Sequence, residues 1–368
     1  MRAQPACAAS LAVMEPLLDV RNLSVQLHAR GRSIQAVSDM SYLLLRGEAL
    51  ALVGESGCGK TVSALTVLGL LPTDAAPIVS GSVMFEGQEL IGLSEAKLQR
   101  IRGSRISMIF QDPQTSLNPV LTIGRQIAEV LETHLAMSRK AADRRAIELL
   151  ELVGVPDASR RLGDYPHQFS GGMRQRVMIA MALACDPAMI IADEPTTALD
   201  VTIQAQVLNV LTRLRTEFDL AVLIITHDLG LVAGFADRVA VMYAGRIVEV
   251  GPTEELLSDP THPYTIGLIG SVPRIDRPRS AALVPIEGSP PDLASRIVGC
   301  PFVPRCAWRT YICTIKDPVL EPAGMAGAQA DSQVRQTACH NRPTLAEAVA
   351  GHPLGAVASR QVDPGRRV

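Results

Sequence analysis

The chain has 368 residues, 47% of them hydrophobic, which is enough to bury the core of one large domain and a smaller one. Its 35 basic and 37 acidic residues give a net charge of −2, so it lacks the broad basic surface expected for nucleic-acid binding. No apolar run reaches the ~18 residues that a membrane-spanning helix needs.

The first part of the chain alternates strand-like and helix-like patterns. We expect a disordered leader at residues 1–16, and translation starts at Met1 or Met14. From residue 17 to about 255 the alternation predicts an α/β domain with a mostly parallel sheet covered by helices. The expected strands are 18–27, 49–54, 189–192, 221–225 and 239–242, and the expected helices are 59–71, 122–137, 140–153, 172–185 and 202–218.

The composition changes after Gly251, where prolines become frequent. This change predicts a separate, loop-rich C-terminal extension over residues 256–345. The last residues, 346–368, are rich in alanine, glycine and arginine, and we expect a flexible tail there.

A glycine-rich loop follows the strand expected at 49–54. Its sequence, GESGCGKT, matches the phosphate-binding pattern G-x-x-x-x-G-K-[ST]. Backbone N–H groups of such a loop cradle phosphates, its lysine reaches the β- and γ-phosphates, and its final hydroxyl binds Mg²⁺. The predicted ATP-binding residues are Gly54, Glu55, Ser56, Gly57, Cys58, Gly59, Lys60 and Thr61.

Two carboxylates end the apolar run MIIADE. A strand there places Asp193 and Glu194 at the carboxyl end of the sheet, where α/β proteins bind ligands. We expect Asp193 to hold Mg²⁺ and Glu194 to activate the attacking water as a general base.

A second phosphate-binding pattern lies in FSGGMRQR. Ser170, Gly171 and Gly172 open a helix whose N-terminal amides suit a phosphate. Because the glycine-rich loop already holds the chain's own nucleotide, we expect these residues to bind the γ-phosphate of ATP held by a second subunit.

These motifs, with Gln111, TTALD and the THD around His227, resemble the nucleotide-binding subunits of ATP-binding cassette (ABC) transporters. The resemblance implies a RecA-like core, an antiparallel β part, a helical subdomain and a head-to-tail dimer that sandwiches two ATP molecules. It further implies that Gln111 senses Mg²⁺ and the membrane domain, that Asp200 lies across the dimer interface, and that His227 contacts the γ-phosphate. The family's base-stacking aromatic is missing, because Leu27 or His28 stands where it is expected.

The extension resembles that of ATPases serving oligopeptide and dipeptide importers, through THPYT, SVP and GCPFVPRC. The implied function is ATP hydrolysis that powers peptide import from the cytoplasmic face of the inner membrane. The implied partners are a second ATPase, in a heterodimer rather than a homodimer, two permease subunits and an extracytoplasmic substrate-binding protein. A nickel or other small-solute importer, or a non-transport ABC ATPase, remains an alternative.

Four cysteines cluster in the extension with the spacing C-x5-C-x6-C-x25-C. Four thiolates bind zinc or an iron–sulfur cluster, and structural zinc sites usually show paired C-x2-4-C spacings, which are missing here. The resemblance implies a [4Fe–4S] cluster on Cys300, Cys306, Cys313 and Cys339. Zinc, or four unrelated buried thiols, are the alternatives, and His340 is a possible substitute ligand.

Overall fold

The computed structural model describes residues 15–29, 31–197, 199–271, 286–323 and 334–342. The expected leader lies outside the described residues except for its last two positions, and the expected tail 346–368 lies wholly outside them. No helix within the described ranges is both long and apolar enough to cross a membrane.

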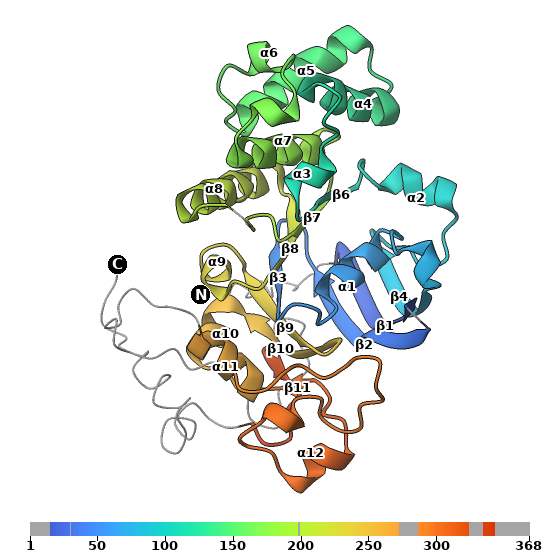
Figure 1. The fold of residues 1–368 in the computed structure, drawn as a ribbon, viewed down its shortest axis with the longest axis vertical. Coiled ribbons are helices and arrows are strands. Elements are labelled where there is room, and N and C mark those ends of the chain that lie inside the picture. The colour runs from blue at the N-terminus through green and yellow to red at the C-terminus, as the bar shows by residue number, and fades with distance from the viewer. Residues whose placement is uncertain (1–14, 30, 198, 272–285, 324–333, 343–368) are drawn as a thin grey trace, which may run out of the picture.

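The main sheet runs through the middle of the molecule (Figure 1). Among the described residues it has eight strands in the order β11-β12-β10-β9-β3-β8-β7-β6. Neighbouring strands from β9 to β6 pair in parallel, as the alternating sequence pattern predicts. The parallel strands are β3 (Ala49–Val53), β6 (Ile106–Ile109), β7 (Met189–Asp193), β8 (Ala221–Thr226) and β9 (Arg238–Tyr243).

Strand β3 shows why this sheet forms from continuous apolar runs. All five of its residues are buried, so both of its faces are covered. Ala49, Ala51 and Val53 belong to a hydrophobic cluster shared with helices between residues 123 and 218. Leu50 and Leu52 belong to a second cluster, shared with strands between residues 18 and 85. The two-residue period of the strand therefore joins the two halves of the core.

A smaller antiparallel sheet packs beside α1 (Lys60–Val67) in the order β2-β1-β4-β5 (Figure 1). The β4–β5 turn uses Glu86 and Gly87, both with positive φ, at 48° and 76°, as a two-residue hairpin requires. The strands of this sheet are β1 (Leu18–Ala29), β2 (Arg32–Leu44), β4 (Ile78–Phe85) and β5 (Gln88–Glu89).

A group of helices stands above the carboxyl ends of β6 and β7 in the view of Figure 1. Two of its helices begin at capping hydroxyls: Thr122 accepts from the Arg125 amide at 3.3 Å at the start of α4, and Ser170 accepts from the Met173 amide at 3.3 Å at the start of α7. The group comprises α3 (Pro113–Ser116), α4 (Ile123–Leu135), α5 (Arg139–Leu152), α6 (Ala158–Arg161), η2 (Pro166–Gln168), α7 (Gly171–Leu183) and α8 (Val201–Phe218).

The C-terminal extension is joined to the main sheet. Glu249 on β10 (Arg246–Pro252) pairs with Thr337 on β12 (Gln336–Thr337), which in turn pairs with β11 (Glu321–Pro322). The extension therefore adds two short strands to the sheet beyond β10. The remaining elements are η1 (Thr73–Ala75), α2 (Glu95–Ile101), α9 (Leu229–Ala233), α10 (Thr253–Ser258), α11 (Pro263–Ser271), η3 (Val303–Arg305) and α12 (Tyr311–Ile315).

Candidate functional site

The glycine-rich loop connects the buried strand β3 to α1 and is enclosed by two other strands. A Cβ on Gly59 would lie 2.2 Å from the carbonyl oxygen of Ala36, and its φ is 105°. A Cβ on Gly54 would lie 2.2 Å from the carbonyl oxygen of Met242. Only glycine fits at both ends, so the loop is clamped between β2 and β9 with α1 starting directly after it.

The lysine of the loop is held close to its own backbone. Nζ of Lys60 donates to the carbonyl oxygens of Gly54 at 2.7 Å and Glu55 at 3.0 Å. Cys58 lies next to it, with Sγ 3.7 Å from Nζ. Burial raises the pKa of the Cys58 thiol and outweighs the opposing effect of Lys60, which favours a packing role over a reactive thiolate.

Thr61 and Asp193 meet at the base of this loop. The Thr61 hydroxyl donates to Oδ1 of Asp193 at 3.2 Å, and Asp193 is only 3% exposed. Burial raises the pKa of Asp193, as does the charge of Glu194, while the Thr61 hydrogen bond and Lys60 oppose the shift. A hydroxyl beside a carboxylate is a pair of hard oxygen ligands, so the donor set fits Mg²⁺.

Glu194 is the centre of the arrangement. Its carboxylate accepts from Gln111 Nε2 at 2.8 Å and from the Thr197 hydroxyl at 2.8 Å, and His227 Nδ1 lies 3.1 Å from its Oε1. Burial raises the pKa of Glu194, but hydrogen bonds from His227 and Thr197, with the charges of His227 and Lys60, outweigh burial and hold the pKa below its usual value. Glu194 is therefore a carboxylate that stays ionised and can accept a proton from water.

The sheet brings these side chains together from distant parts of the chain. Gln111 comes just after β6, Glu194 just after β7 and His227 just after β8. Because β6, β7 and β8 are adjacent and parallel, their carboxyl ends meet at one edge. The sequence did not predict the contact between Thr197 and Glu194. The position of Thr197, inside TTALD and three residues after Glu194, could have indicated it.

The Ser170–Gly172 motif lies elsewhere. Ser170 caps α7, and a Cβ on Gly172 would lie 2.6 Å from Cγ2 of Ile203 on α8. Figure 1 shows α7 in the helical group with α4 and α5, apart from α1. Within the described part of the chain, no hydrogen bond joins Ser170, Gly171 or Gly172 to the glycine-rich loop.

Asp200 and the two candidate base-stacking residues have simple surroundings. Asp200 is exposed at the N-cap position of α8, and its side chain makes no capping hydrogen bond. Leu27 is partly buried against the core of the antiparallel sheet, so it offers only apolar contact. His28 is exposed, and its Nδ1 lies 3.3 Å from the carbonyl oxygen of Ala76.

The four cysteines of the extension line one small pocket. Burial raises the pKa of Cys300 to about 11 and that of Cys306 to about 12. Cys339 Sγ accepts from the Arg342 amide at 3.3 Å, while His340 turns its Nε2 to the Lys316 carbonyl oxygen at 2.9 Å. Yet no three His, Cys, Asp or Glu side chains among the described residues are arranged to hold a metal ion. The fold thus gathers the four sulfurs without metal-ligand geometry.

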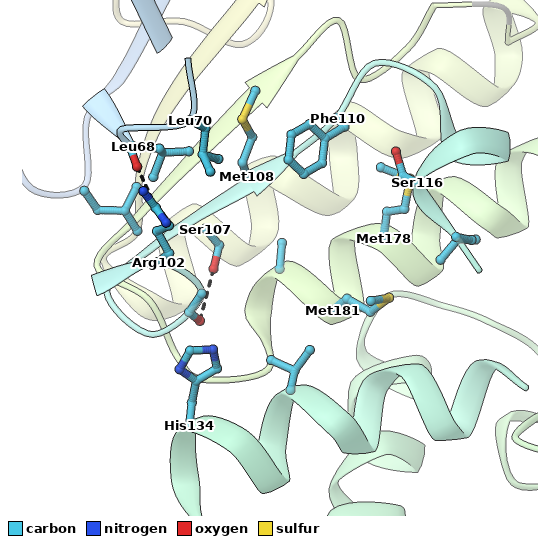
Figure 2. Close-up of a pocket in the computed structure, with 15 residues that line it drawn as sticks. Leu68, Leu70, Arg102, Ser107, Met108, Phe110, Ser116, His134, Met178 and Met181 are labelled. Carbon is cyan, nitrogen blue, oxygen red and sulfur yellow. Dashed lines mark hydrogen bonds between the residues drawn. The ribbon is translucent and has the colours of Figure 1, made fainter. Parts of the chain in front are cut away.

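A largely apolar pocket of about 270 Å³ lies between the main sheet and the helical group. Figure 2 shows Met108, Met178 and Met181 on its walls, with Phe110 at one end. Phe110 is 42% exposed and directly precedes Gln111, the hydrogen-bond partner of Glu194. One wall of this pocket therefore comes from the residue that precedes a hydrogen-bond partner of Glu194.

Two family patterns match the chain. The pattern described as ABC transporter matches residues 37–197, and the pattern described as oligopeptide/dipeptide transporter, C-terminal region, matches residues 248–313. The first covers the glycine-rich loop, the Ser170 motif and Glu194, and the second covers three of the four cysteines.

Proteins of similar sequence cover most of the chain. The dipeptide transport ATP-binding protein DppD of Bacillus subtilis is 53% identical over 300 residues, which are 82% of this chain and 89% of that protein. The oligopeptide transport ATP-binding protein OppD of Haemophilus influenzae is 51% identical over 302 residues, 82% of this chain and 93% of that protein.

Solved structures of similar fold include the dimeric ATP-binding cassette MJ0796 in a post-hydrolysis state bound to ADP and Pi. The TM-score is 0.58 at 28% sequence identity, over 64% of this chain and 98% of that one. The likeness covers nearly all of the known cassette and leaves a third of this chain outside it.

Proposed function

Because the chain belongs to the ATP-binding subunits of ABC transporters, in the oligopeptide/dipeptide transport family, we propose that it hydrolyses MgATP to power the import of dipeptides or oligopeptides. It is an ABC-type ATPase. The single observation that carries the catalytic assignment is the convergence of Gln111, Thr197 and His227 on the Glu194 carboxylate.

The roles of the residues follow from that arrangement. Lys60 and the loop amides bind the β- and γ-phosphates. Thr61 and Asp193 would hold Mg²⁺, which supplies neutralisation of the charge on the phosphate oxygens. Glu194 accepts the proton of the attacking water, and Gln111 and His227 orient its carboxylate. What supports these roles is that all of them lie at the edge where β3, β6, β7 and β8 end.

Replacing Glu194 tests this function directly. Glu194→Gln preserves the hydrogen-bonding shape but cannot accept a proton, so turnover should fall by roughly two to four orders of magnitude while MgATP binding persists. Single-turnover hydrolysis and equilibrium binding by the assembled transporter measure the two effects. Asp317→Asn, at the exposed ion pair with Arg246, is the matched control. Near-normal turnover of Glu194→Gln would remove the assignment.

The second phosphate motif supports a partner cassette. Ser170, Gly171, Gly172 and Asp200 make no hydrogen bond to the chain's own glycine-rich loop within the described ranges, and Asp200 is exposed. They would bind ATP held by a second ATPase subunit, in a heterodimer. MJ0796, a solved relative of similar fold, is a dimer.

The apolar pocket supports a site for the membrane subunits. Its Met-rich wall can adapt to an inserted apolar side chain, and Phe110 links that wall to Gln111 and hence to Glu194. An amphipathic helix of a permease would bind there, with two permeases and an extracytoplasmic binding protein completing the importer. The chain would then be peripheral on the cytoplasmic face of the inner membrane, with residues 17–255 as the ATPase domain and 256–345 as the extension.

For the cysteine-lined pocket the proposal is a [4Fe–4S] cluster on Cys300, Cys306, Cys313 and Cys339. What supports it is that all four thiols line one pocket. Protein purified without oxygen should be brown and contain about four irons per chain, and replacing any one of the four by serine should bleach it. Cys185→Ser is the matched control. Stoichiometric zinc without iron, or no metal at all, would contradict the cluster.

A further inference from the structure

Glu55, the second residue of the glycine-rich loop, is held by two side chains that lie about 200 residues or more further along the chain. Its carboxylate pairs with Arg305, and its amide donates to the hydroxyl of Tyr264 at 2.9 Å. Neither partner comes from a nucleotide-binding motif in the sequence. Both belong to the region after Gly251, where the change in composition predicts a separate extension.

The Arg305 guanidinium is fully engaged. Nη1 donates to Oε2 of Glu55 at 2.7 Å and Nη2 to Oε1 at 2.9 Å, so the ion pair is bidentate. The remaining donors go to the backbone oxygens of Glu287 at 3.0 Å and Ile286 at 3.1 Å, and to the Tyr243 hydroxyl at 3.4 Å. The Arg305 side chain is 4% exposed, which makes this pair far less accessible to water than a surface salt bridge.

Tyr264 is positioned by the THPYT turn. The turn is tied to the main sheet by the fully buried Glu249, whose carboxylate accepts from the Thr261 amide at 2.8 Å and the His262 amide at 3.1 Å. The ring of Tyr264 packs against Phe302, with 5.5 Å between centroids, and Phe302 also lines the cysteine pocket. The extension thus supports the loop from a rigid, buried base.

The charge of Glu55 makes this support necessary. A carboxylate in the loop that receives a polyphosphate repels it, and Lys60 bonds to the carbonyl oxygen of Glu55, so a shift of this residue also displaces the lysine. We propose that Arg305 and Tyr264 are positioning residues that neutralise and fix Glu55, so that the extension sets the affinity of the loop for MgATP. This inference rests on the proposed function and adds the extension to its nucleotide site.

A charge-rescue experiment tests the proposal on the full-length chain. Arg305→Met removes the charge at similar volume and should raise the Kd for MgATP roughly tenfold. The double variant Glu55→Gln/Arg305→Met has no unpaired charge and should return the Kd to within about twofold of the wild type. Tyr264→Phe deletes one hydroxyl and should weaken binding about threefold. Arg335→Met is the control, because Arg335 also ties the extension to the ATPase domain, through the backbone oxygen of Glu255 at 3.4 Å, and pairs with Asp259, away from the loop.

The kinetic pattern separates positioning from general instability. In the assembled transporter, Arg305→Met should raise KM for MgATP while kcat at saturation stays within about threefold. Arg305→Lys keeps the charge, and hence the fold, but loses the bidentate geometry, so its Kd should lie between those of wild type and Arg305→Met. A Kd of Arg305→Met or of Arg305→Lys equal to wild type, or a double variant as weak as Arg305→Met, would overturn the inference. Failure of the wild type itself to bind MgATP would instead refute the proposed function.

Discussion

Glu194 has a φ of 46°, in the left-handed region that a residue with a Cβ seldom adopts. Such strain persists only where the surroundings enforce it, and here three side chains hold the carboxylate: Gln111 after β6, His227 after β8 and Thr197 in the segment that follows β7. The backbone conformation and the hydrogen bonds therefore together fix the orientation of the Glu194 carboxylate at the edge of the sheet.

The residues near the expected base site lead to a prediction about nucleotide selectivity. Leu27 is partly buried and offers only apolar contact, and the exposed His28 has its Nδ1 3.3 Å from the carbonyl oxygen of Ala76, so no phenylalanine, tyrosine or tryptophan ring stands at the expected position. Loss of a stack costs on the order of 1 kcal/mol, so ATP and GTP affinities should lie within roughly tenfold of each other. Competition binding with both nucleotides measures this, and Leu27→Phe should favour the purine stack. A strong ATP preference that vanishes in His28→Ala would show that His28 stacks after all.

At the scale of elements, the β4–β5 hairpin is tied to the main sheet through Glu86. Its carboxylate accepts from Arg46, in the loop before β3, and from Arg105, just before β6, with Arg105 Nε at 3.2 Å. Burial raises the pKa of Glu86, but the two arginines outweigh it and lower the pKa below its usual value. The turn thus carries a glutamate in a left-handed conformation where asparagine would be the commoner choice.

This ion-pair network predicts a pH-dependent contribution to stability. Because the folded pKa of Glu86 is lowered, its contribution is present above the unfolded pKa of about 4.3 and is lost as pH falls through the folded value. Glu86→Gln should cost about 1 kcal/mol of unfolding free energy at pH 7, after allowance for its partial exposure, and the difference should shrink below pH 4. Denaturant unfolding at both pH values measures it. A deficit that is the same at pH 7 and below pH 4 would contradict the electrostatic explanation, and Glu95→Gln, at an exposed pair, is the control.

In the molecule as a whole, the two phosphate-binding motifs and the apolar pocket lie in different places. The glycine-rich loop and Glu194 lie where strands of the main sheet end, and Ser170–Gly172 lie on the helical group. The pocket beside Phe110 lies between the main sheet and the helical group. A membrane subunit bound in this pocket would contact both, so its position would change if one moved relative to the other.

This arrangement predicts that hydrolysis depends on assembly. The purified chain alone should bind MgATP but hydrolyse it slowly, and addition of the second ATPase with the permeases should stimulate turnover by an order of magnitude or more. Phe110→Asp should abolish that stimulation, because a charge in the apolar pocket opposes docking, and leave MgATP binding unchanged. Steady-state ATPase assays on reconstituted complexes measure both, with Val298→Asp, at an exposed site in the extension, as control. Full activity of a strictly monomeric preparation would rule out the partner requirement.

Sequence patterns identify the family and many of the elements, whereas the strands β2, β4 and β6 had no predicted counterpart. Each strand and helix expected between residues 18 and 242 is found within a few residues of its predicted bounds, because local apolar periodicity and capping residues set these elements. The motifs also predict where the site residues lie. The positions of Lys60, Asp193 and Glu194 relative to β3 and β7 follow from the order of residues along the chain.

Which distant residues meet is known from the tertiary structure alone. Arg305 contacts Glu55 across 250 residues of sequence, and Thr337 pairs with Glu249 across 88. The spacing of hydrophobic residues predicts a single helix or strand, but it does not predict how two elements pair. Their pairing depends on the packing of the whole core. For the same reason the cysteine spacing could place four thiols in one segment, whereas only the fold brings them to one pocket, which His262 and Phe302 also line.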